Sequence, residues 1–249
     1  MIPYERQEKI LEILKNKELM KIEELQKLIA GVSISTLRRD LKELEKMGKI
    51  EYLFGGAVKL FSDTGEIPIS KKSALNNPEK ETIASLATAV ICPGDTIYLD
   101  SGSSCSILLK RILHKKITIY TTNTNVFNIS TEVEAEIILI GGLYNPLISS
   151  LSGPLTDENL QNLYFDKAFL GVNGVDQEKG ITTPNLAEAV KKRLIHKHSS
   201  KTYILADSSK FHKFSNVKAL EVKDVILISD KYDETLGEHV EMITPDKKG

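Results

Sequence analysis

One short segment, residues 31–48, constrains this chain more than any other, because its pattern predicts a capped amphipathic helix. Ser33 stands where a helix N-cap belongs, and Gly48 stands where a helix ends. Apolar side chains recur at spacings of three and four and form one stripe: Ile34, Leu37, Leu41, Leu44 and Met47. Off this stripe lie polar and basic side chains: Ser35, Arg38, Arg39, Lys42 and Lys46. Such a helix suits the major groove of DNA, although a solvated surface helix has the same pattern.

Two further amphipathic helices are predicted before this segment. Residues 3–16 place apolar side chains among charges, and a shorter apolar pattern runs from Ile22 to Ile29. Gly31 interrupts the second pattern just before Ser33. A helix, a short turn that contains glycine and a second helix form a helix-turn-helix.

The segment after the helix predicts a β-hairpin. Short apolar runs at residues 49–54 and 57–60 flank Gly55 and Gly56, and both glycines can take a positive φ. Three helices followed by a hairpin make a winged helix, whose hairpin tip would lie near the DNA backbone or the minor groove. Any tight turn can contain two glycines, so the order of the elements is what favours the wing.

These motifs resemble the DeoR family of bacterial transcriptional regulators. The family pattern V-S-x-x-T-[IL]-R-R-D-L-x-x-L stands here at residues 32–44, and the family's Gly-Gly-Ala wing stands at residues 55–57. We expect base edges to meet Ser35, Thr36 and Arg39, and phosphates to meet Lys42. The full set of DNA-binding residues that the resemblance implies is Ser33, Ser35, Thr36, Arg38, Arg39, Lys42, Gly55 and Gly56.

The wing departs from the family pattern at two positions. The family carries an Arg and often a His in the strand before the two glycines, whereas this chain carries Tyr52 and Phe54. The wing therefore contacts DNA with fewer charges than usual, or it chiefly packs.

The charge of the chain is nearly balanced. The net charge of −1 argues against a general nucleic-acid binder, and residues 1–60 carry 12 Lys and Arg against 10 Asp and Glu. DNA affinity would then depend on local charge and on paired copies, so we expect a homodimer or a homotetramer. The two cysteines, Cys92 and Cys105, predict small buried side chains. No metal and no cofactor are implied, and the charged start without a long apolar run predicts a cytoplasmic protein with no membrane contact.

The chain divides into three predicted parts: a winged helix-turn-helix at residues 1–60, a linker at 61–76 and a larger α/β domain at 77–249. The linker range carries Ser, Asp, Gly and Pro with no clear period. Beyond it, strand-like apolar runs alternate with helical patterns, which predicts a mostly parallel sheet covered by helices. The predicted strands are 95–99, 117–121, 136–140, 167–171, 202–206 and 225–229. The predicted helices are 79–91, 103–113, 155–163 and 185–198.

Small polar or glycine residues follow five of these strands. In a parallel sheet these positions share the carboxyl edge, where open α/β folds bind ligands. The residues are Asp100 to Ser104, Thr122, Asn123, Gly141, Gly142, Gly171, Gly174 and Asp207 to Lys210. Tight turns also favour such residues in loops. Five loops of this kind on one edge of the sheet nevertheless predict a polar pocket.

The loop after the first of these strands is the most specific of the five. Gly102, Ser103 and Ser104 offer backbone N–H groups, hydroxyls and a helix N-terminus to a phosphate. Asp100 would accept hydrogen bonds from sugar hydroxyls or cap the helix. Lys210 would neutralise the same anion or stay solvated.

Glu188 and Lys192 stand four residues apart on the last predicted helix. Asn185, three residues before Glu188, is a fair N-cap, so the two side chains can form a cap and an i,i+4 pair worth about 0.3–0.5 kcal/mol. The alternative places both side chains over the polar pocket.

The resemblance to the DeoR family continues to about residue 230. The family motifs D-x-G-[ST]-[ST], T-N, G-G, F-x-G-x-x-G, a Glu followed by Lys or Arg, and D-x-S-K match residues 100–104, 122–123, 141–142, 169–174, 188–193 and 207–210. The resemblance implies a fold similar to ribose-5-phosphate isomerase and glucosamine-6-phosphate deaminase, and a phosphorylated sugar as effector. The implied effector-binding residues are Asp100, Gly102, Ser103, Ser104, Thr122, Asn123, Gly141, Gly142, Gly171, Gly174, Glu188, Lys192, Asp207 and Lys210.

Three functions compete for this sequence. The leading interpretation is a regulator, most simply a repressor, that binds double-stranded operator DNA under the control of a phosphorylated sugar. The second is a sugar-phosphate isomerase or deaminase with an appended helical head, in which Asp100, Glu188 and Asp207 would serve as acid and base groups. The third is an adaptor whose helical head binds a protein.

Overall fold

The computed structural model describes residues 2–15, 17, 19–29, 31–47, 49–53, 56–60 and 68–245. Contacts divide the chain into two compact units, Met1–Gly65 and Glu66–Gly249. The predictions made for Gly48, Phe54 and Gly55 lie outside the described residues. The domain limits at residues 60 and 76 stay a prediction.

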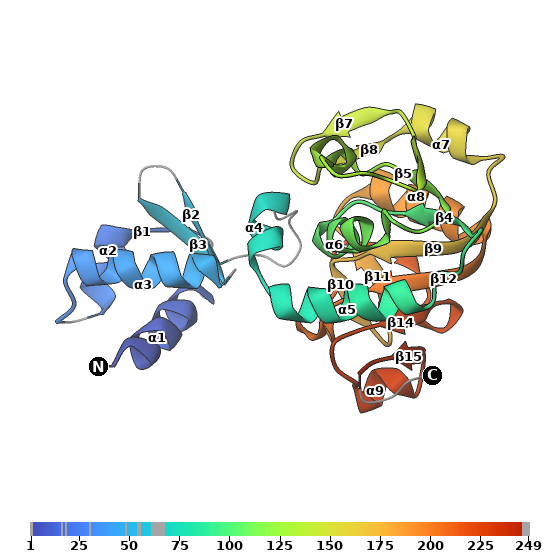
Figure 1. Ribbon diagram of the computed structural model, residues 1–249. Helices are drawn as coiled ribbons and strands as arrows, with labels where there is room; N and C mark the ends of the chain where they lie inside the picture. The colour runs from blue at the N-terminus through green and yellow to red at the C-terminus, as the bar shows by residue number, and fades with distance from the viewer. Residues whose placement is uncertain are drawn as a thin grey trace. The chain divides into compact units, whose positions relative to one another are not determined.

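The first unit is a helix-turn-helix followed by a hairpin (Figure 1). Its described elements are α1 (Pro3–Lys15), β1 (Met20–Lys21), α2 (Ile22–Leu28), α3 (Ile34–Lys46), β2 (Ile50–Leu53) and β3 (Ala57–Leu60). The three predicted helices and the predicted hairpin are therefore confirmed. Strand β1 was not predicted; it pairs antiparallel with β3 and makes a small sheet of order β1-β3-β2.

The apolar stripe of α3 forms the centre of this unit's core. Leu37, Leu41 and Leu44 are fully buried. They pack in one cluster with apolar side chains from every other element of the unit: Ile10, Leu14, Met20, Ile22, Leu25, Ile29, Ile50 and Val58. Met47, which the sequence placed on the same stripe, is instead 54% exposed, because the helix ends at Lys46 and Met47 lies past its last turn.

The second unit is built on a seven-stranded sheet in which every pairing is parallel. Its strands are β4 (Thr96–Leu99), β5 (Thr118–Thr121), β6 (Glu136–Leu139), β9 (Phe165–Gly171), β12 (Ser199–Leu205), β14 (Ile226–Ile228) and β15 (Glu241–Ile243). All six predicted strands lie in this sheet. The prediction missed β15, an edge strand of three residues.

Helices cover both faces of the sheet. On one face, α5 (Asn77–Ala89) and α6 (Ser103–Ile112) pack on alternate side chains such as Leu99 and Phe169. On the other, α7 (Pro154–Leu160) and α8 (Leu186–Lys197) pack on the side chains between them, such as Tyr98. A sheet that is covered twice explains why its strands read as nearly continuous apolar runs.

The order of the strands reverses beside β4. The sheet runs β15-β14-β12-β9-β4-β5-β6, so the chain adds β5 and β6 on one side of β4 and then adds β9, β12, β14 and β15 on the other. The carboxyl ends of β4 and β9 therefore mark the topological switch point, where folds of this kind bind ligands.

Short antiparallel strands complete the unit, and the sequence pattern did not predict them. They are β7 (Leu143–Asn145) with β8 (Ser150–Ser152), and β10 (Gly174–Asp176) with β11 (Gly180–Thr183) and β13 (Val217–Leu220). Each has three or four residues and lies outside the apolar runs that mark the parallel sheet. The last helix, α9 (Glu234–Gly237), is equally short.

A short helix lies in the range that the sequence assigned to a linker. Helix α4 (Ile69–Ala74) has six residues and no buried side chain. The sequence did not predict this helix, because a contact with distant Leu147 holds it and no apolar period marks it. Among the described residues, the structure contains no helix with the length and apolar character that a membrane crossing requires.

Candidate DNA-binding helix and ligand site

The N-terminus of α3 carries a cluster of three hydroxyl groups. Ser33 is the N-cap, with φ −74° and ψ 152°, and its Oγ accepts a hydrogen bond from the Thr36 N–H at 3.1 Å. The same Oγ lies 2.8 Å from Ser35 Oγ and 2.9 Å from Thr36 Oγ1. The predicted cap is therefore confirmed. A capped helix N-terminus with small polar groups also favours a nearby phosphate.

The basic side chains of α3 point away from the core. Arg38, Arg39 and Lys42 are exposed, whereas Leu37 and Leu41 beside them are fully buried. Within the described residues, none of the three basic side chains takes part in an ion pair. Their charges remain available to an anionic partner, as a DNA-reading helix requires. Their contact with DNA stays a prediction.

Asp40 joins α3 to the first helix through a buried ion pair. Its two carboxylate oxygens face Arg6, whose Nη2 donates to Oδ1 at 2.9 Å and whose Nε donates to Oδ2. Nearby, Gln7 Nε2 donates to Glu43 Oε2 at 2.7 Å. The pair fixes α1 against α3, on the side opposite to the exposed arginines.

Sequence reasoning missed the role of Asp40, although a signal existed. Asp40 stands three residues after Leu37 and four before Leu44, which places it on the apolar stripe. A carboxylate in that position is buried on folding and needs a partner. The identity of the partner, 34 residues away on another helix, is not readable from the pattern.

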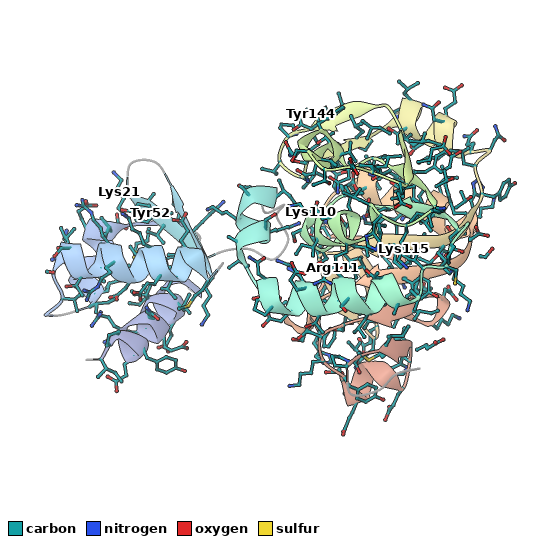
Figure 2. All side chains as sticks on the ribbon, viewed as in Figure 1. Lys21, Tyr52, Lys110, Arg111, Lys115 and Tyr144 are labelled. Atoms are coloured by element: carbon teal, nitrogen blue, oxygen red, sulfur yellow. The ribbon has the colours of Figure 1, made fainter. Side chains whose placement is uncertain are left out.

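The described part of the wing packs on the unit's core. Gly56 has a φ of +80°, as the hairpin prediction required, and its carbonyl accepts a hydrogen bond from the Ile22 N–H at 3.0 Å. Tyr52 lies on β2, packs against the buried cluster of the unit and donates its N–H to Glu45 Oε1 at 3.4 Å (Figure 2). For Tyr52, packing is the better of the two readings.

In the second unit, Asp100 lies at the switch point of the sheet. It directly follows β4, and its N–H donates to the carbonyl of Phe169 on β9 at 3.0 Å. Its side chain is fully buried and forms an ion pair with Lys192, while Lys191 Nζ lies 3.8 Å from Oδ1. Asp100 Oδ1 has no hydrogen-bond donor among the described residues.

A buried polar network surrounds this carboxylate. Lys191 Nζ donates to Thr122 Oγ1 at 3.0 Å, to Ser150 Oγ at 2.9 Å and to Glu188 Oε1 at 3.0 Å. Lys192 Nζ lies 3.8 Å from Glu188 Oε2. We refer to six residues as the Asp100 cluster: Asp100, Thr122, Ser150, Glu188, Lys191 and Lys192. It contains two carboxylates and two ammonium groups, so its charges balance.

Burial and charge act in opposite directions on the cluster. Burial alone would raise the pKa of Asp100, but the nearby ammonium groups of Lys192 and Lys191 outweigh it and lower the pKa below its ordinary value. Burial alone would lower the pKa of Lys192, but Asp100 and Glu188 raise it above its ordinary value. Both groups therefore remain ionised at neutral pH.

Two neighbouring groups stay protonated because burial and the charge of Asp100 both raise their pKa. Burial, followed by the charge of Asp100, raises the pKa of Tyr98, whose hydroxyl lies 2.9 Å from Thr122 Oγ1. Burial and then Asp100 also raise the pKa of the Cys105 thiol, which is buried as predicted. Cys92 is exposed, so its prediction as a buried side chain was wrong; it follows the last turn of α5 and lies outside the core.

The helix that follows Asp100 begins without a side-chain cap. Gly102 is the N-cap of α6 with a φ of +121°, and no side chain caps this end of the helix. Asp100 therefore does not cap α6, which removes that reading of the sequence. Ser103 and Ser104 open the helix and are each 8% exposed. The first-turn N–H groups of such a helix attract an anion.

Two more predicted residues adjoin this loop. Asn123 Nδ2 donates to Ser106 Oγ on α6 at 3.0 Å, and Asn123 Oδ1 accepts from the Asn125 N–H at 3.0 Å. Gly171 ends β9, and a Cβ there would lie 3.1 Å from the carbonyl oxygen of Ser101. Both residues hold the loop in place, and Gly171 does so because it is small.

The remaining predicted residues lie in separate places. The carbonyl of Gly141 accepts from Thr156 Oγ1 at 2.8 Å, and a Cβ at Gly142 would collide with the same threonine. A Cβ at Gly174 would collide with the backbone at Lys213. Gly142 and Gly174 therefore allow close packing, whereas a Cβ at Gly141 would meet no atom within 4 Å. The structure does not bring these three glycines into the Asp100 cluster.

Asp207 and Lys210 lie on the loop after β12. Asp207 Oδ1 accepts from the Ser209 N–H at 3.2 Å and caps a short 3-10 helix, Ser208–Lys210. It also accepts from Asn76 Nδ2 at 3.0 Å. The loop shares the carboxyl edge with Asp100, and one strand, β9, lies between their parent strands β12 and β4.

The sequence predicted four members of the Asp100 cluster as site residues, but it did not predict Lys191 and Ser150. The four are Asp100, Thr122, Glu188 and Lys192. Lys191 stands three residues from Glu188, and Lys192 stands four, so a helix places both on one side. The signal for Lys191 was therefore present. Ser150 comes from β8, a strand of three residues that no pattern announced.

Together, the two units define a class of protein. One unit presents a capped basic helix beside a wing, and the other presents a buried ionic cluster and an uncapped helix N-terminus at a switch point. A protein of this class is a DNA-binding regulator with an α/β sensor unit.

The comparisons with known proteins identify the family. The family model described as the DeoR-like helix-turn-helix domain matches residues 6–62, and the one described as the DeoR C terminal sensor domain matches residues 75–231. The chain belongs to the DeoR family of transcriptional regulators.

Relatives of similar length match along nearly all of the chain. The HTH-type transcriptional regulator FruR of Bacillus subtilis is 34% identical over 94% of this chain and 93% of its own length. The lactose phosphotransferase system repressor of Staphylococcus epidermidis is 30% identical over 98% of this chain and 100% of its own length. These relatives are regulators, which favours that interpretation over an isomerase or a deaminase. Ribose 5-phosphate isomerase A of Methanocaldococcus jannaschii matches 53% of each chain at 16% identity, with a TM-score of 0.38.

Proposed function

We propose that this chain is a transcriptional repressor whose affinity for operator DNA is controlled by a phosphorylated sugar bound at the Asp100 cluster. The proposal that a phosphorylated sugar is the effector rests on one observation at Asp100. Its fully buried carboxylate keeps one oxygen without a hydrogen-bond donor, directly before the uncapped N-terminus of α6. The Staphylococcus epidermidis relative is a lactose phosphotransferase system repressor, which agrees with this proposal.

In the DNA-binding unit, α3 would enter the major groove of the operator. Ser35, Thr36 and Arg39 would meet base edges, while Lys42 would meet a phosphate. Ser33, Arg38, Gly55 and Gly56 would complete the contact surface. One such helix covers few base pairs, so a homodimer or a homotetramer on paired half-sites would supply the specificity.

In the sensor unit, the two ends of a phosphorylated sugar would find different partners. The phosphate would lie at Gly102, Ser103 and Ser104, where the N-terminus of α6 favours an anion. Sugar hydroxyls would donate to Asp100 and Glu188, and Lys192 lies within ion-pair distance of both carboxylates. Thr122, Asn123 and Gly171 would shape the pocket floor, and Asp207 and Lys210 would close its side.

Linkage between the two units requires only a modest free energy. If effector and operator favour different arrangements of the chain, a coupling of about 1–3 kcal/mol changes operator affinity roughly 5- to 150-fold. A coupling of this size is enough to switch occupancy at a single site.

A gel-shift titration with the DNA upstream of the chain's own operon tests the first half of the proposal. We expect sequence-selective binding that weakens with salt, and at least tenfold weaker binding by the Arg38→Ala/Arg39→Ala variant. Lys9→Ala, which removes an exposed positive charge from α1, is the matched control. Unselective binding that survives loss of both arginines contradicts the proposal.

The second half is tested by adding phosphorylated sugars to the same titration. We expect one member of a pentose and hexose phosphate panel to shift both the melting temperature and the operator affinity. The Asp100→Asn variant should lose the response to that sugar while it still binds DNA. A panel in which no sugar phosphate changes either quantity argues against the effector.

A further inference from the structure

Residues 69–76 lie where the chain enters the second unit. They run along the carboxyl edge of the sheet, which we call the ligand edge because the proposed site lies there. Ile69, the first residue of α4, donates its N–H to the carbonyl of Leu147 at 2.7 Å. Seven residues later, Asn76 Nδ2 donates to Asp207 Oδ1 at 3.0 Å and to Ser209 Oγ at 3.1 Å. Both ends of residues 69–76 are therefore attached to distant parts of the chain.

The two attachment points lie on opposite sides of the switch point. Leu147 belongs to the hairpin that follows β6, and Asp207 follows β12. In the sheet order, three strands separate β12 from β6, namely β9, β4 and β5. These are the strands whose carboxyl ends carry Gly171, Asp100 and Thr122, and α4 also packs against α6 (Figure 1). Residues 69–76 thus cross the edge at which the Asp100 cluster lies.

Polar contacts at a few points hold this crossing segment. None of the side chains of α4 is buried, so apolar packing contributes little to its position. Lys80, itself 4% exposed, closes the end of α4 by donating from Nζ to the carbonyls of Lys72 and Leu75. Asn76 takes a left-handed backbone conformation, with φ 52° and ψ 43°, and forms the corner between α4 and α5. Segments held in this way open at low free-energy cost.

The contact at Asp207 occupies an acceptor that the proposed ligand would use. Asp207 Oδ1 accepts from Asn76, from the Ser209 N–H and from Ser209 Oγ, so its acceptor positions on that oxygen are occupied. A sugar hydroxyl that donates to this oxygen replaces one of these donors, and the Asn76 amide is the one that comes from a distant segment of the chain. The segment released in this way continues N-terminally into residues 61–67 and the DNA-binding unit.

We propose that residues 69–76 form a strap across the ligand edge, which a sugar phosphate displaces by breaking the bond between Asn76 and Asp207. Release of the strap is then the first step by which the occupied site acts on the chain that leads to the DNA-binding unit. This inference rests on the proposed function, because it assigns a regulatory step to the same site.

Hydrogen exchange on the full chain without any ligand is the first test. The Asn76→Ala variant should exchange the amides of residues 69–75 about tenfold faster than the wild type, because it loses an amide hydrogen bond to a charged carboxylate. Lys80→Met should have a similar local effect. The matched control is Asn159→Ala on α7, which loses a 2.8 Å amide hydrogen bond to Leu155 away from the strap.

Two measurements together decide this test: the melting temperature and the rate of amide exchange. An unchanged melting temperature of the second unit shows that each variant is folded, so faster exchange at 69–75 reports local release. If the Asn76→Ala variant is folded and its amides at residues 69–75 exchange no faster than in the wild type, the strap proposal is wrong.

Exchange with added ligand is the second test, with ribose 5-phosphate, fructose 6-phosphate and inorganic phosphate as probes. A probe that binds should speed the exchange of residues 69–75 in the wild type, and it should bind Asn76→Ala several-fold more tightly because the competing amide is gone. If a sugar phosphate binds and weakens operator binding while the amides of residues 69–75 stay protected from exchange, the strap proposal is wrong and the proposed function stands. If no sugar phosphate binds either protein, both are wrong.

Discussion

Replacing Asp100 by Asn tests whether the buried cluster depends on balanced charge. The change keeps the shape of the side chain and removes its charge. Glu188 then remains as a single carboxylate beside the two buried ammonium groups of Lys191 and Lys192, so the cluster carries an uncompensated positive charge. Breaking a buried ion pair by removing one partner costs about 3–5 kcal/mol. For a unit of this size, that loss lowers the melting temperature by roughly 10 °C.

A double-mutant cycle separates the charge effect from other causes. Lys192→Met in the Asp100→Asn background removes the surplus charge and leaves Glu188 paired with Lys191 at 3.0 Å. We expect the double variant to be more stable than the sum of the single variants predicts, by about 2 kcal/mol. The assay is denaturant unfolding of the full chain, followed by a probe in the second unit. Asp166→Asn is the matched control, since Asp166 is an exposed carboxylate that accepts from the Thr96 N–H at 2.8 Å.

Two results would refute this reasoning. A loss below 1 kcal/mol in Asp100→Asn would mean that water or a shift of the lysines compensates the charge. Additive losses in the double variant would mean that Asp100 and Lys192 do not interact energetically.

Three further predictions concern DNA binding, the cap and pH. Arg39→Ala should weaken operator binding by about 1–3 kcal/mol and relax selectivity at one base pair, measured by gel shift against single-base operator variants, with Lys9→Ala unchanged. Ser33→Ala should cost the first unit about 1 kcal/mol of unfolding free energy, because Thr36 loses its cap acceptor; an unchanged denaturation midpoint contradicts the cap. Since the pKa of Asp100 is lower in the folded state, its contribution is present above about pH 3.9 and is lost as pH falls through the lowered value, so wild-type stability should fall more steeply than that of Asp100→Asn below this pH. Parallel acid limbs of the two titrations would be the contrary outcome.

The sequence predicted those parts of the fold whose periods run over many residues. The stripe of α3 and six strands of the parallel sheet follow from apolar spacing and apolar runs, and the structure has them within a few residues of the predicted limits. The strand Leu143–Asn145 lies outside these runs, and helix α4 buries no side chain that could have marked it. These elements exist because of contacts with distant residues.

The candidate site was predictable in part for a topological reason. The rule that parallel strands end at one edge brings Asp100 and Thr122 together, and helical spacing adds Glu188 and Lys192. The same rule grouped Gly141, Gly142 and Gly174 with them, but Gly142 and Gly174 are small because other backbone or side-chain atoms lie against them. A pattern of glycines does not distinguish a ligand pocket from tight packing.

The pair between Arg6 and Asp40 has a consequence for engineering new operator specificity. Moving α3 into another regulator is one way to change which operator that regulator binds, because α3 carries the exposed basic side chains. Asp40 is almost fully buried, however, and its partner lies on α1. A graft of α3 into a scaffold without an equivalent of Arg6 would strand a carboxylate in the core, so α1 has to travel with the helix that it supports.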